Sequence, residues 1–223
     1  QNLAKEIVKE YGKAKIITAN NAFAHMDNLK EIMQGIKILM KEDSIFVFEI
    51  SYLLDVIEKV LLGTIFHEHH SYHSIKPLKK FFDNFDMELI DITRNNIQGG
   101  SLVGVVQFKK GKYKIDNSVQ ETLMIEQKKK IDEVETLKVF AKDLDITKQK
   151  VKSLFNEIVQ QKKVIAGFGA ARSGTTLITQ MQIGNMIEYM VDDNETKQGK
   201  YSPGDHILVK PTDYIYESMP DYL

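Results

Sequence analysis

The sequence predicts an α/β protein with two sheets. Short β-branched or aromatic runs alternate with stretches whose apolar residues recur every three or four positions, as strands alternate with helices. Two later strands, Glu88 to Arg94 and Ser101 to Phe108, lie too close in sequence for a crossover helix and should pair antiparallel. A second strand, glycine and helix pattern begins at Val164. We therefore expect a doubly wound sheet that ends in an antiparallel hairpin, then helices, then a further α/β domain.

The first region, residues 1–115, has the elements of half such a sheet. Apolar spacing predicts helices at Asn2 to Tyr11, Leu29 to Met40 and Tyr52 to Leu62. Gly63 should end the third helix, and Ser74 should cap a fourth helix that has Pro77 in its first turn. Strands are predicted at Lys15 to Ala19 and at Ser44 to Ile50, the second buried on both faces. No glycine-rich turn precedes them, so we expect the half that would hold a nucleotide-like cofactor to be missing.

A long polar helical region, residues 116–162, follows. Ser118 and Glu121 match a capping box, which predicts a helix that runs to about Lys142. A second helix is predicted at Thr147 to Gln161. No stretch rich in Pro, Gly or Ser separates these helices from their neighbours, so we expect them to form a rigid connection.

The last region, residues 163–223, begins with a buried strand, Val164 to Gly169, and continues into a helix that ends near Ile183. The next strand, Ile187 to Val191, ends in Asp192 and Asp193. This order predicts a second domain with a parallel sheet, incomplete at its C-terminal end.

Composition narrows the classes of function. With 223 residues, 43% of them hydrophobic, the chain can bury a sizeable core. No apolar run reaches the roughly 18 residues of a membrane span, no signal peptide starts the chain and cysteine is absent, so we expect a cytoplasmic protein. The 30 basic and 31 acidic residues give no net field that would recruit nucleic acid. An exposed edge of a half sheet would favour association of copies.

The densest group of titratable residues is the histidine stretch, Thr64 to Ser74 (TIFHEHHSYHS), which holds four of the six histidines. Three interpretations remain open. The histidines could bind a metal through His67, His69 or His73, although the HExxH spacing and thiolates are both absent. They could bond backbone groups and solvent in an ordinary loop. They could perform acid/base catalysis, since the imidazole pKa is near 6.5.

Polar residues also follow the strands of both sheets. In doubly wound sheets ligands bind beyond the carboxyl ends of strands, where Asn20 to His25 and Glu49 to Tyr52 fall. The glycines at the end of Val164 to Gly169 would let backbone N–H groups approach a phosphate, and Arg172 to Thr176 adds donors. A tight turn without a ligand is the competing interpretation, because Arg172 stands where a dinucleotide fingerprint has its third glycine.

Six segments together resemble successive motifs of one family. They are Asn20 to Met26 (NNAFAHM), Phe48 to Tyr52 (FEISY), Thr64 to Tyr72 (TIFHEHHSY), Gln98 to Leu102 (QGGSL), Gly167 to Leu177 (GFGAARSGTTL) and Val191 to His206 (VDDNETKQGKYSPGDH). In this order they look like motifs of the S-adenosylmethionine-dependent sugar C-methyltransferases. The resemblance implies a class I methyltransferase fold followed by a Rossmann-like domain. It also implies methylation of the carbon next to the ketone of a nucleotide-linked keto-sugar, a step of deoxysugar biosynthesis.

The resemblance implies roles for particular residues. His69 would be the base, Glu68 would orient or polarise nearby groups, and His25 would donate to the enolate oxygen. The expected contacts with S-adenosylmethionine are Asn20, Asn21, Phe23 and Ala24. The expected contacts with the sugar nucleotide are Phe66, Tyr72, Ser101, Gly167, Gly169, Arg172, Ser173, Thr175, Asp192 and Tyr201. No metal is expected.

Three departures from the family pattern affect these expectations. The family's cysteine-bearing zinc domain and glycine-rich cofactor loop are absent, so we expect an incomplete S-adenosylmethionine site, with weak cofactor binding and no methyl transfer by the chain alone. Phe66 replaces the family's usual tyrosine, and the basic loop residue is Arg172 instead of a lysine at Ser173. The alternative function is a nucleotide-binding or dinucleotide-binding module without catalysis.

Overall fold

The computed structural model describes residues 1–223, and the chain divides into two compact units. The first unit consists of residues 1–61 and 67–138, and the second of residues 62–66 and 139–223. The chain therefore passes into the second unit for five residues immediately before the histidines and then returns. The helical region at 116–162 is shared between both units.

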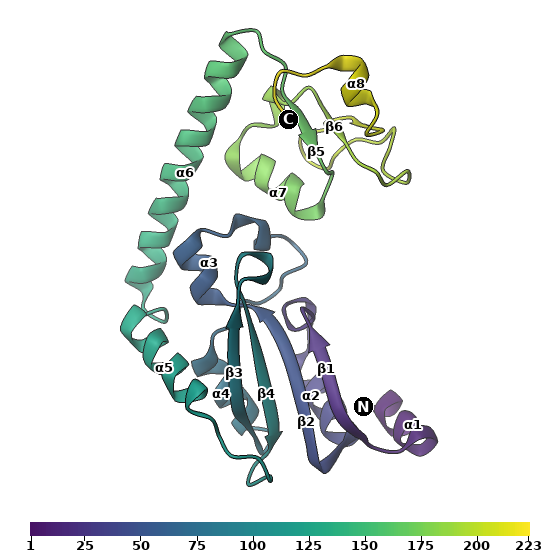
Figure 1. Cartoon of the computed structure of the whole chain (residues 1–223), viewed down its shortest axis with the longest axis vertical. Coiled ribbons are helices and arrows are strands. Elements are labelled where there is room, and N and C mark those ends of the chain that lie inside the picture. The colour runs from purple at the N-terminus through teal and green to yellow at the C-terminus, as the bar shows by residue number, and fades with distance from the viewer. The chain divides into compact units, whose positions relative to one another are not determined.

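The first unit contains a four-stranded sheet (Figure 1). Its strands are β1 (Ala14–Asn20), β2 (Met40–Ser51), β3 (Met87–Asn95) and β4 (Ser101–Phe108). They lie in the order β1-β2-β4-β3. Strand β4 pairs antiparallel with both β2 and β3, so the predicted hairpin is confirmed. Strands β1 and β2 are parallel, so their carboxyl ends lie at the same end of the sheet.

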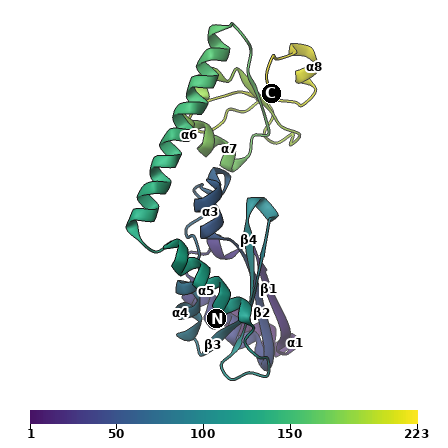
Figure 2. The same cartoon turned by 60° about the vertical axis from the view of Figure 1, so that its left-hand side comes forward.

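The helices of this unit are α1 (Asn2–Tyr11), α2 (Leu29–Leu39), α3 (Leu53–Lys59), α4 (Ile75–Asp83) and α5 (Asn117–Lys129). Figure 2 shows α4 and α5 on the same side of the sheet, and both contact β3. On β2 the buried side chains Phe46, Phe48 and Ile50 alternate with half-buried ones. The prediction that this strand is buried on both faces is therefore wrong, because only one face packs fully into the core.

The core of the first unit is largely aromatic. The Phe23 ring stacks on Phe46 and Phe48, with centroid distances of 5.7 and 5.5 Å, and Phe82 of α4 lies 5.4 Å from Phe48. Phe23 comes from a 3-10 turn, η1 (Phe23–His25), that follows β1. Burial of this ring fixes the turn against the sheet, and the turn carries His25.

Two predicted helix ends are wrong. Helix α3 stops when Val60 adopts a left-handed conformation with φ 51°, three residues before Gly63, and a separate turn, η2 (Leu62–Thr64), follows. The break between the later helices lies at Lys130, with φ 52°, and α6 (Val134–Gln160) then runs without interruption through residues 143–146. No glycine or proline occurs within α6, so nothing in its sequence stops the helix at the predicted place.

Two predicted caps are also different. Asp116, not Ser118, caps α5, because its side chain accepts the Ser118 N–H at 2.8 Å. The Ser118 hydroxyl donates instead to Asp91 of β3 at 2.9 Å. Ser74 does occupy the N-cap position of α4, but its side chain makes no capping bond.

The second unit is a small α/β layer around a three-stranded sheet (Figure 1). Its strands β5 (Ala166–Phe168), β6 (Tyr189–Val191) and β7 (Val209–Lys210) are parallel, in that order. The helices of this unit are α7 (Arg172–Met181), α8 (Tyr214–Ser218) and most of α6, and it also has a 3-10 turn, η4 (Gly184–Met186). A further 3-10 turn, η3 (Ile97–Gly99), belongs to the first unit. Ile178 and Met181 of α7 pack against the buried face of the sheet at Met190 and Val209.

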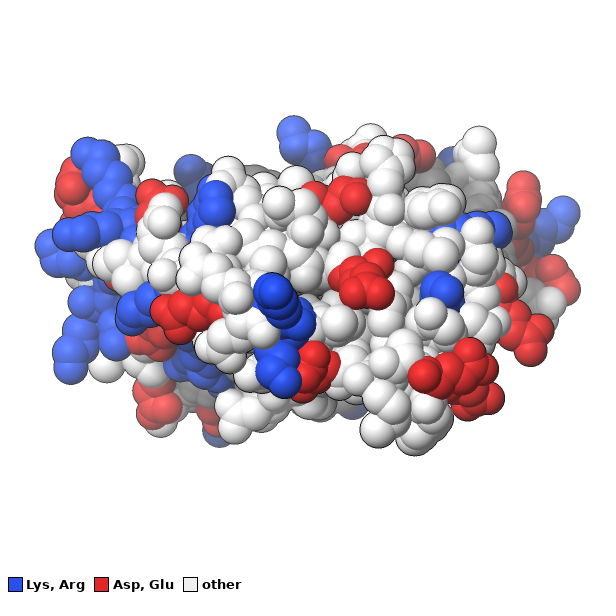
Figure 3. All heavy atoms as spheres, turned by 90° about the horizontal axis from the view of Figure 1, so that it is seen from above, with Lys and Arg blue, Asp and Glu red and all other residues white.

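Charge is mixed over the surface. Figure 3 shows lysine and arginine side chains gathered toward its left, with acidic side chains among them, and mostly uncharged atoms in its centre. The charges of both signs in this view agree with the even charge balance of the sequence.

Among the helices of residues 1–223, none combines the length and the apolar character needed to cross a bilayer.

A buried carboxylate joins α3 to β3. The Asp55 side chain is fully buried and accepts two hydrogen bonds from Arg94, at 2.9 and 2.7 Å, while Lys59 Nζ lies 2.7 Å from Asp55 Oδ1. Burial by itself would raise the pKa of Asp55, but the bonds from Arg94 and Lys59 outweigh it and the pKa is lowered. Gly100 is required beside it, because a Cβ there would lie 2.4 Å from Asp55 atoms.

We expect Arg94→Ala to lower the free energy of unfolding by about 3 kcal/mol at pH 7, since it leaves a buried charge with half of its partners. The stabilisation is present above the unfolded pKa of about 3.9 and is lost as the pH falls through the lowered folded pKa. Denaturant unfolding at pH 7 and pH 3 should therefore show a larger difference at pH 7. Lys138→Ala, which breaks an exposed pair with Glu135, is the control and should have little effect at either pH. An equal loss in the two variants would contradict this account.

Candidate functional site

The histidine stretch lies against the η1 turn and is attached to it at two points. The His70 N–H donates to the Ala24 carbonyl at 2.7 Å, and the His70 ring pairs with the Asp27 carboxylate. Three residues later the His73 ring packs edge-on against Phe23, with 6.0 Å between centroids. The backbone around Tyr72 is therefore held at both ends, over the carboxyl end of β1.

His73 is a structural residue of this loop. Its ring is buried, and its Nε2 lies 3.0 Å from Ser71 Oγ. Burial lowers the pKa of His73 more than its hydrogen bond with the Phe23 backbone raises it, so the ring is neutral at pH 7. Within residues 1–223, no three His, Asp or Glu side chains are arranged to hold a metal ion.

The loop brings together two residues that the sequence analysis placed in catalysis. The rings of His25 and His69 meet edge to face, with centroids 4.7 Å apart and planes at 74°. The Tyr72 ring also packs edge-on against His69, with 6.1 Å between centroids. His25 is exposed, whereas the Nδ1 atom of His69 is buried. We call these three residues the His25–His69–Tyr72 cluster.

Glu68 and Phe66 flank the cluster in sequence. Glu68 is half-buried, and its Oε1 lies 3.9 Å from Nε2 of the exposed His67. Phe66 ends the five-residue segment that belongs to the second unit, whereas His67 returns to the first. The roles predicted for Glu68 and Phe66 stay predictions.

The residues predicted to contact the cofactor lie directly before the cluster. Asn20 is exposed at the end of β1, opposite Glu49 of β2. Asn21 adopts a left-handed conformation with φ 49°, and its N–H donates to the Glu49 carbonyl at 2.8 Å. Ala24 is buried and Phe23 is fully buried, so the Phe23 ring is not open to a ligand. The turn therefore has polar residues, Asn20 and Asn21, next to a buried aromatic residue, Phe23.

Glu49 is a site residue to which the sequence analysis gave no role. Ser101 begins β4 and is buried. Its hydroxyl oxygen lies 2.6 Å from Glu49 Oε1, to which it donates, and 2.8 Å from Asn95 Oδ1. Ser101, expected to contact the substrate, therefore holds a carboxylate in place. The signal for Glu49 was its position near the end of β2, in the FEISY motif.

The second unit carries the glycine-rich loop between β5 and α7. Gly169 has φ +89°, which suits glycine, and its N–H donates to Val191 O at 2.7 Å. The next N–H, of Ala170, donates to Asp192 Oδ2 at 2.7 Å, and Asp192 also binds the Asn194 N–H and Lys197 Nζ, at 2.9 and 2.8 Å. The hydrogen bond from Lys197 is the main reason why the pKa of Asp192 is lowered. Asp192 thus ties the loop to β6.

A cavity of about 270 Å³ lies beside this loop, at the start of α7. Its lining includes Thr175 and Tyr201, which were predicted, and Lys197 and Lys200, which were not. The lysines follow the acidic pair at the end of β6, and that spacing was the signal for them. The Thr175 hydroxyl donates to the Arg172 carbonyl at 3.0 Å, and Arg172 itself is exposed. Two lysines, a threonine and a tyrosine are therefore among the residues that line one cavity.

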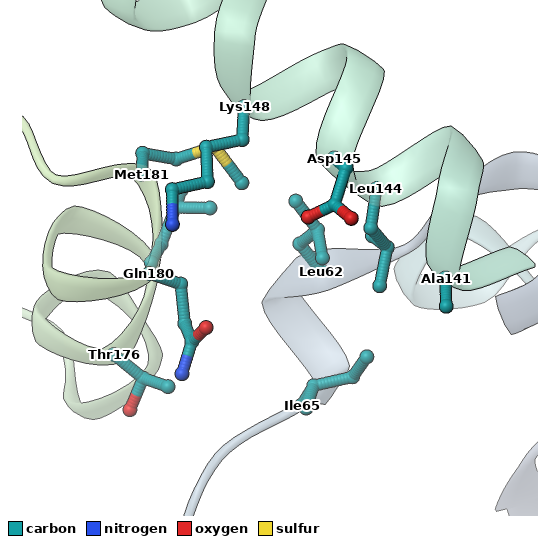
Figure 4. Close-up of a pocket in the computed structure, with 10 residues that line it drawn as sticks. Leu62, Ile65, Ala141, Leu144, Asp145, Lys148, Thr176, Gln180 and Met181 are labelled. Atoms are coloured by element: carbon teal, nitrogen blue, oxygen red, sulfur yellow. The ribbon is translucent and has the colours of Figure 1, made fainter.

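The other predicted loop residues separate from this group. Gly167 and Gly169 line an apolar cavity of about 360 Å³ with Tyr222 and Leu223. Ser173 is half-buried in the first turn of α7. Thr176 lines a third cavity, of about 320 Å³, where Figure 4 shows Asp145 and Lys148 projecting from α6. Only part of the predicted phosphate loop thus borders the lysine-lined cavity.

Comparison with known proteins gives two matches in sequence. Residues 96–223 match a family model described as the C-methyltransferase C-terminal domain. Over 221 residues the chain is 28% identical to C-methyltransferase NovU from Streptomyces niveus, which covers 99% of this chain and 53% of the relative. The chain thus spans about half the length of this curated relative.

Two solved structures are more distant. The crystal structure of M1.HpyAVI and that of the M1.HpyAVI-SAM complex are each 14% identical to the chain, with TM-scores of 0.32 and 0.33. The alignments cover 49% and 50% of this chain and 51% and 52% of those chains. Likeness at this level carries no argument about the site.

We expect Asp192→Ala to loosen the glycine-rich loop, because three donors lose their acceptor at once. Hydrogen exchange of the Ala170 and Asn194 amides should speed up at least about tenfold. In the wild-type chain the protection should persist above about pH 4 and fall as the pH drops through the lowered pKa of Asp192. Asp193→Ala is the matched control, since Asp193 is exposed and binds only the Thr212 hydroxyl. Unchanged exchange in Asp192→Ala would refute the tie between loop and strand.

Proposed function

The chain belongs to the C-methyltransferase family, and we propose that it supplies the acid/base and substrate-holding groups for methyl transfer from S-adenosylmethionine to carbon. The proposed acceptor is the carbon next to the ketone of a nucleotide-linked keto-sugar. This substrate class rests on the six family motifs, and two features of the structure support it: the His25–His69–Tyr72 cluster and the lysine-lined cavity.

In a ketone, the neighbouring carbon becomes a nucleophile by losing a proton. A C–H bond next to a carbonyl gives an enolate, whose negative charge develops on the carbonyl oxygen. The site therefore needs one group that takes the proton from carbon and one that donates to the oxygen, close enough to act on adjacent atoms.

The observation that carries the proposal is the contact between His25 and His69. With ring centroids 4.7 Å apart, the two imidazoles are spaced for neighbouring atoms of one substrate. We assign His69 as the base, because Tyr72 packs against its ring and its Nδ1 is buried, which fixes the ring orientation. His25 is exposed and is assigned to the enolate oxygen.

The methyl donor would meet this chain at the β1 edge. S-adenosylmethionine supplies an electrophilic methyl group when bound. Asn20 and the backbone of Asn21 are polar and accessible at the carboxyl end of β1, where doubly wound sheets bind their ligands. These residues would hold one side of the cofactor, and they lie next in sequence to the turn that carries His25.

The nucleotide part of the substrate is assigned to the second unit. A diphosphate needs cationic donors. Lys197 and Lys200 line the cavity beside the glycine-rich loop, and Arg172 is the first residue of α7. Tyr201 is 62% exposed and offers a ring face for a nucleobase. The positive end of α7 would add to the attraction for phosphate.

Replacement of the base is the first test. We expect His69→Gln, in the active enzyme that contains this chain, to lower turnover by about 10² to 10⁴ while both substrates still bind, which is the usual loss for a general base. His67→Gln is the matched control, since the His67 ring is 72% exposed and lies outside the cluster. Equal turnover in His69→Gln and wild type would remove His69 from the base role.

Nucleotide binding by the chain is the second test. Calorimetry with uridine and thymidine diphosphates should give at least about fivefold weaker affinity for Arg172→Ala and Lys200→Ala, with a larger difference at low salt. Lys142→Ala, on α6 and exposed, controls for net charge. Wild-type affinity in both loop variants would contradict the assignment. Tighter binding of a dinucleotide than of a nucleoside diphosphate would favour the non-catalytic module.

A further inference from the structure

A buried carboxylate outside the cluster lies at the end of the histidine stretch. Glu126 of α5 is 2% exposed. Its Oε1 accepts the Ile75 N–H at 2.6 Å and the Tyr52 hydroxyl at 3.0 Å, and its Oε2 accepts the Lys76 N–H at 3.0 Å. All three partners are donors, so the side chain of Glu126 accepts from each of them.

The partners of Glu126 are the residues that flank His73. Ile75 and Lys76 are the first residues of α4 and follow His73 and Ser74 directly. On the other side Tyr52 forms a parallel bridge with His73, and the Leu53 N–H donates to the His73 carbonyl at 3.0 Å. One carboxylate therefore binds the residues that follow His73 in the chain and also Tyr52, which pairs with His73.

This arrangement is costly and so calls for a reason. A helix start can be capped by the residue beside it, yet the Ser74 side chain makes no capping bond and the cap comes from about 50 residues later in the chain. Burial and the charge of Glu126 raise the pKa of Tyr52, which keeps its phenol protonated as a donor. A buried charge lowers stability unless its bonds are complete, so this network fixes one backbone position sharply.

We propose that Glu126 is a positioning residue for His69. Tyr72 lies between two fixed points, the bond from His70 to Ala24 and the Glu126-bound start of α4, and its ring packs edge-on against His69 with 6.1 Å between centroids. Through Tyr72, the Glu126 carboxylate thereby holds the His69 ring against His25. The catalytic meaning of this role rests on the proposed function, whereas the positional claim does not.

Nuclear magnetic resonance of the whole chain tests the positional claim. In Glu126→Gln the amide nitrogen faces an N–H or O–H donor, so at least one of three bonds is lost. We expect the nuclear Overhauser contact between the His25 and His69 rings to fall at least about twofold and their signals to shift, with signals of the second unit unchanged. Glu121→Gln, an exposed glutamate of the same helix, should leave both rings as in wild type.

A second variant covers the case in which Glu126→Gln does not fold. Tyr52→Phe removes one of the three hydrogen bonds and keeps the ring in the core, and it should shift the same two rings to a smaller extent. Wild-type signals for His25 and His69 in folded Glu126→Gln would overturn the proposal. If that variant does not fold, wild-type signals in Tyr52→Phe would overturn it.

Kinetics separate this claim from the proposed function. In the active enzyme Glu126→Gln should lower kcat about tenfold or more and leave KM for both substrates within about twofold, since only the geometry of proton transfer changes. If His69→Gln leaves turnover unchanged, the base assignment fails while the ring contact still decides the role of Glu126. Changes in KM without a change in kcat would overturn the positioning role.

Discussion

A polar loop can hold an imidazole in place only if its backbone is attached close to that residue. Here the bond from the His70 N–H to the Ala24 carbonyl provides one attachment. This attachment is effective because the η1 turn is itself fixed by the Phe23 ring, which is buried and stacks on Phe46 and Phe48. The position of His69 thus depends on an aromatic core several residues away in sequence. The contact between the His25 and His69 rings therefore depends on the packing of Phe23 in the core.

The two units offer different kinds of chemistry. The first unit carries titratable groups after β1 and near the end of β2, namely the paired imidazoles of His25 and His69 and the Glu49 carboxylate. The second carries ammonium groups beside a glycine turn, where Asp192 holds the loop and Lys197 together. Proton transfer needs groups with a pKa near neutrality, whereas phosphate binding needs permanent charge. The first unit therefore suits proton transfer, and the second suits binding of an anionic group.

The sequence was sufficient where a local pattern decides the structure. The spacing between Glu88 and Phe108 leaves no room for a crossover, so the antiparallel hairpin followed directly. Helix ends were less predictable, because Val60 and Lys130 adopt left-handed conformations that non-glycine residues take up only in context. Long-range bonds were not predictable at all. Nothing within a few residues of Ser74 indicates that Glu126 caps the helix, and Ser118 matched a local cap but is used by Asp91.

The site divides in the same way. His25 and His69 were identified by residue type and by motif, but their contact arises from the fold of the loop over η1. Lys197 and Lys200 were passed over because charged residues in a polar segment are common, and only the cavity distinguishes them. Phe23 was expected at the cofactor, yet its burial shows that the motif includes residues that shape the turn from below.

Hydrogen exchange at carbon tests the central claim most directly, because it isolates proton abstraction from methyl transfer. The active enzyme would be incubated in D₂O with a nucleotide-linked keto-sugar and without the methyl donor, and proton resonance would follow the hydrogens next to the ketone. The account predicts that one of these signals disappears at least about 100-fold faster than in buffer, as expected for general-base catalysis. The account would be contradicted if the hydrogens at that carbon exchange no faster than in buffer and if, once S-adenosylmethionine is added, the sugar is methylated on oxygen.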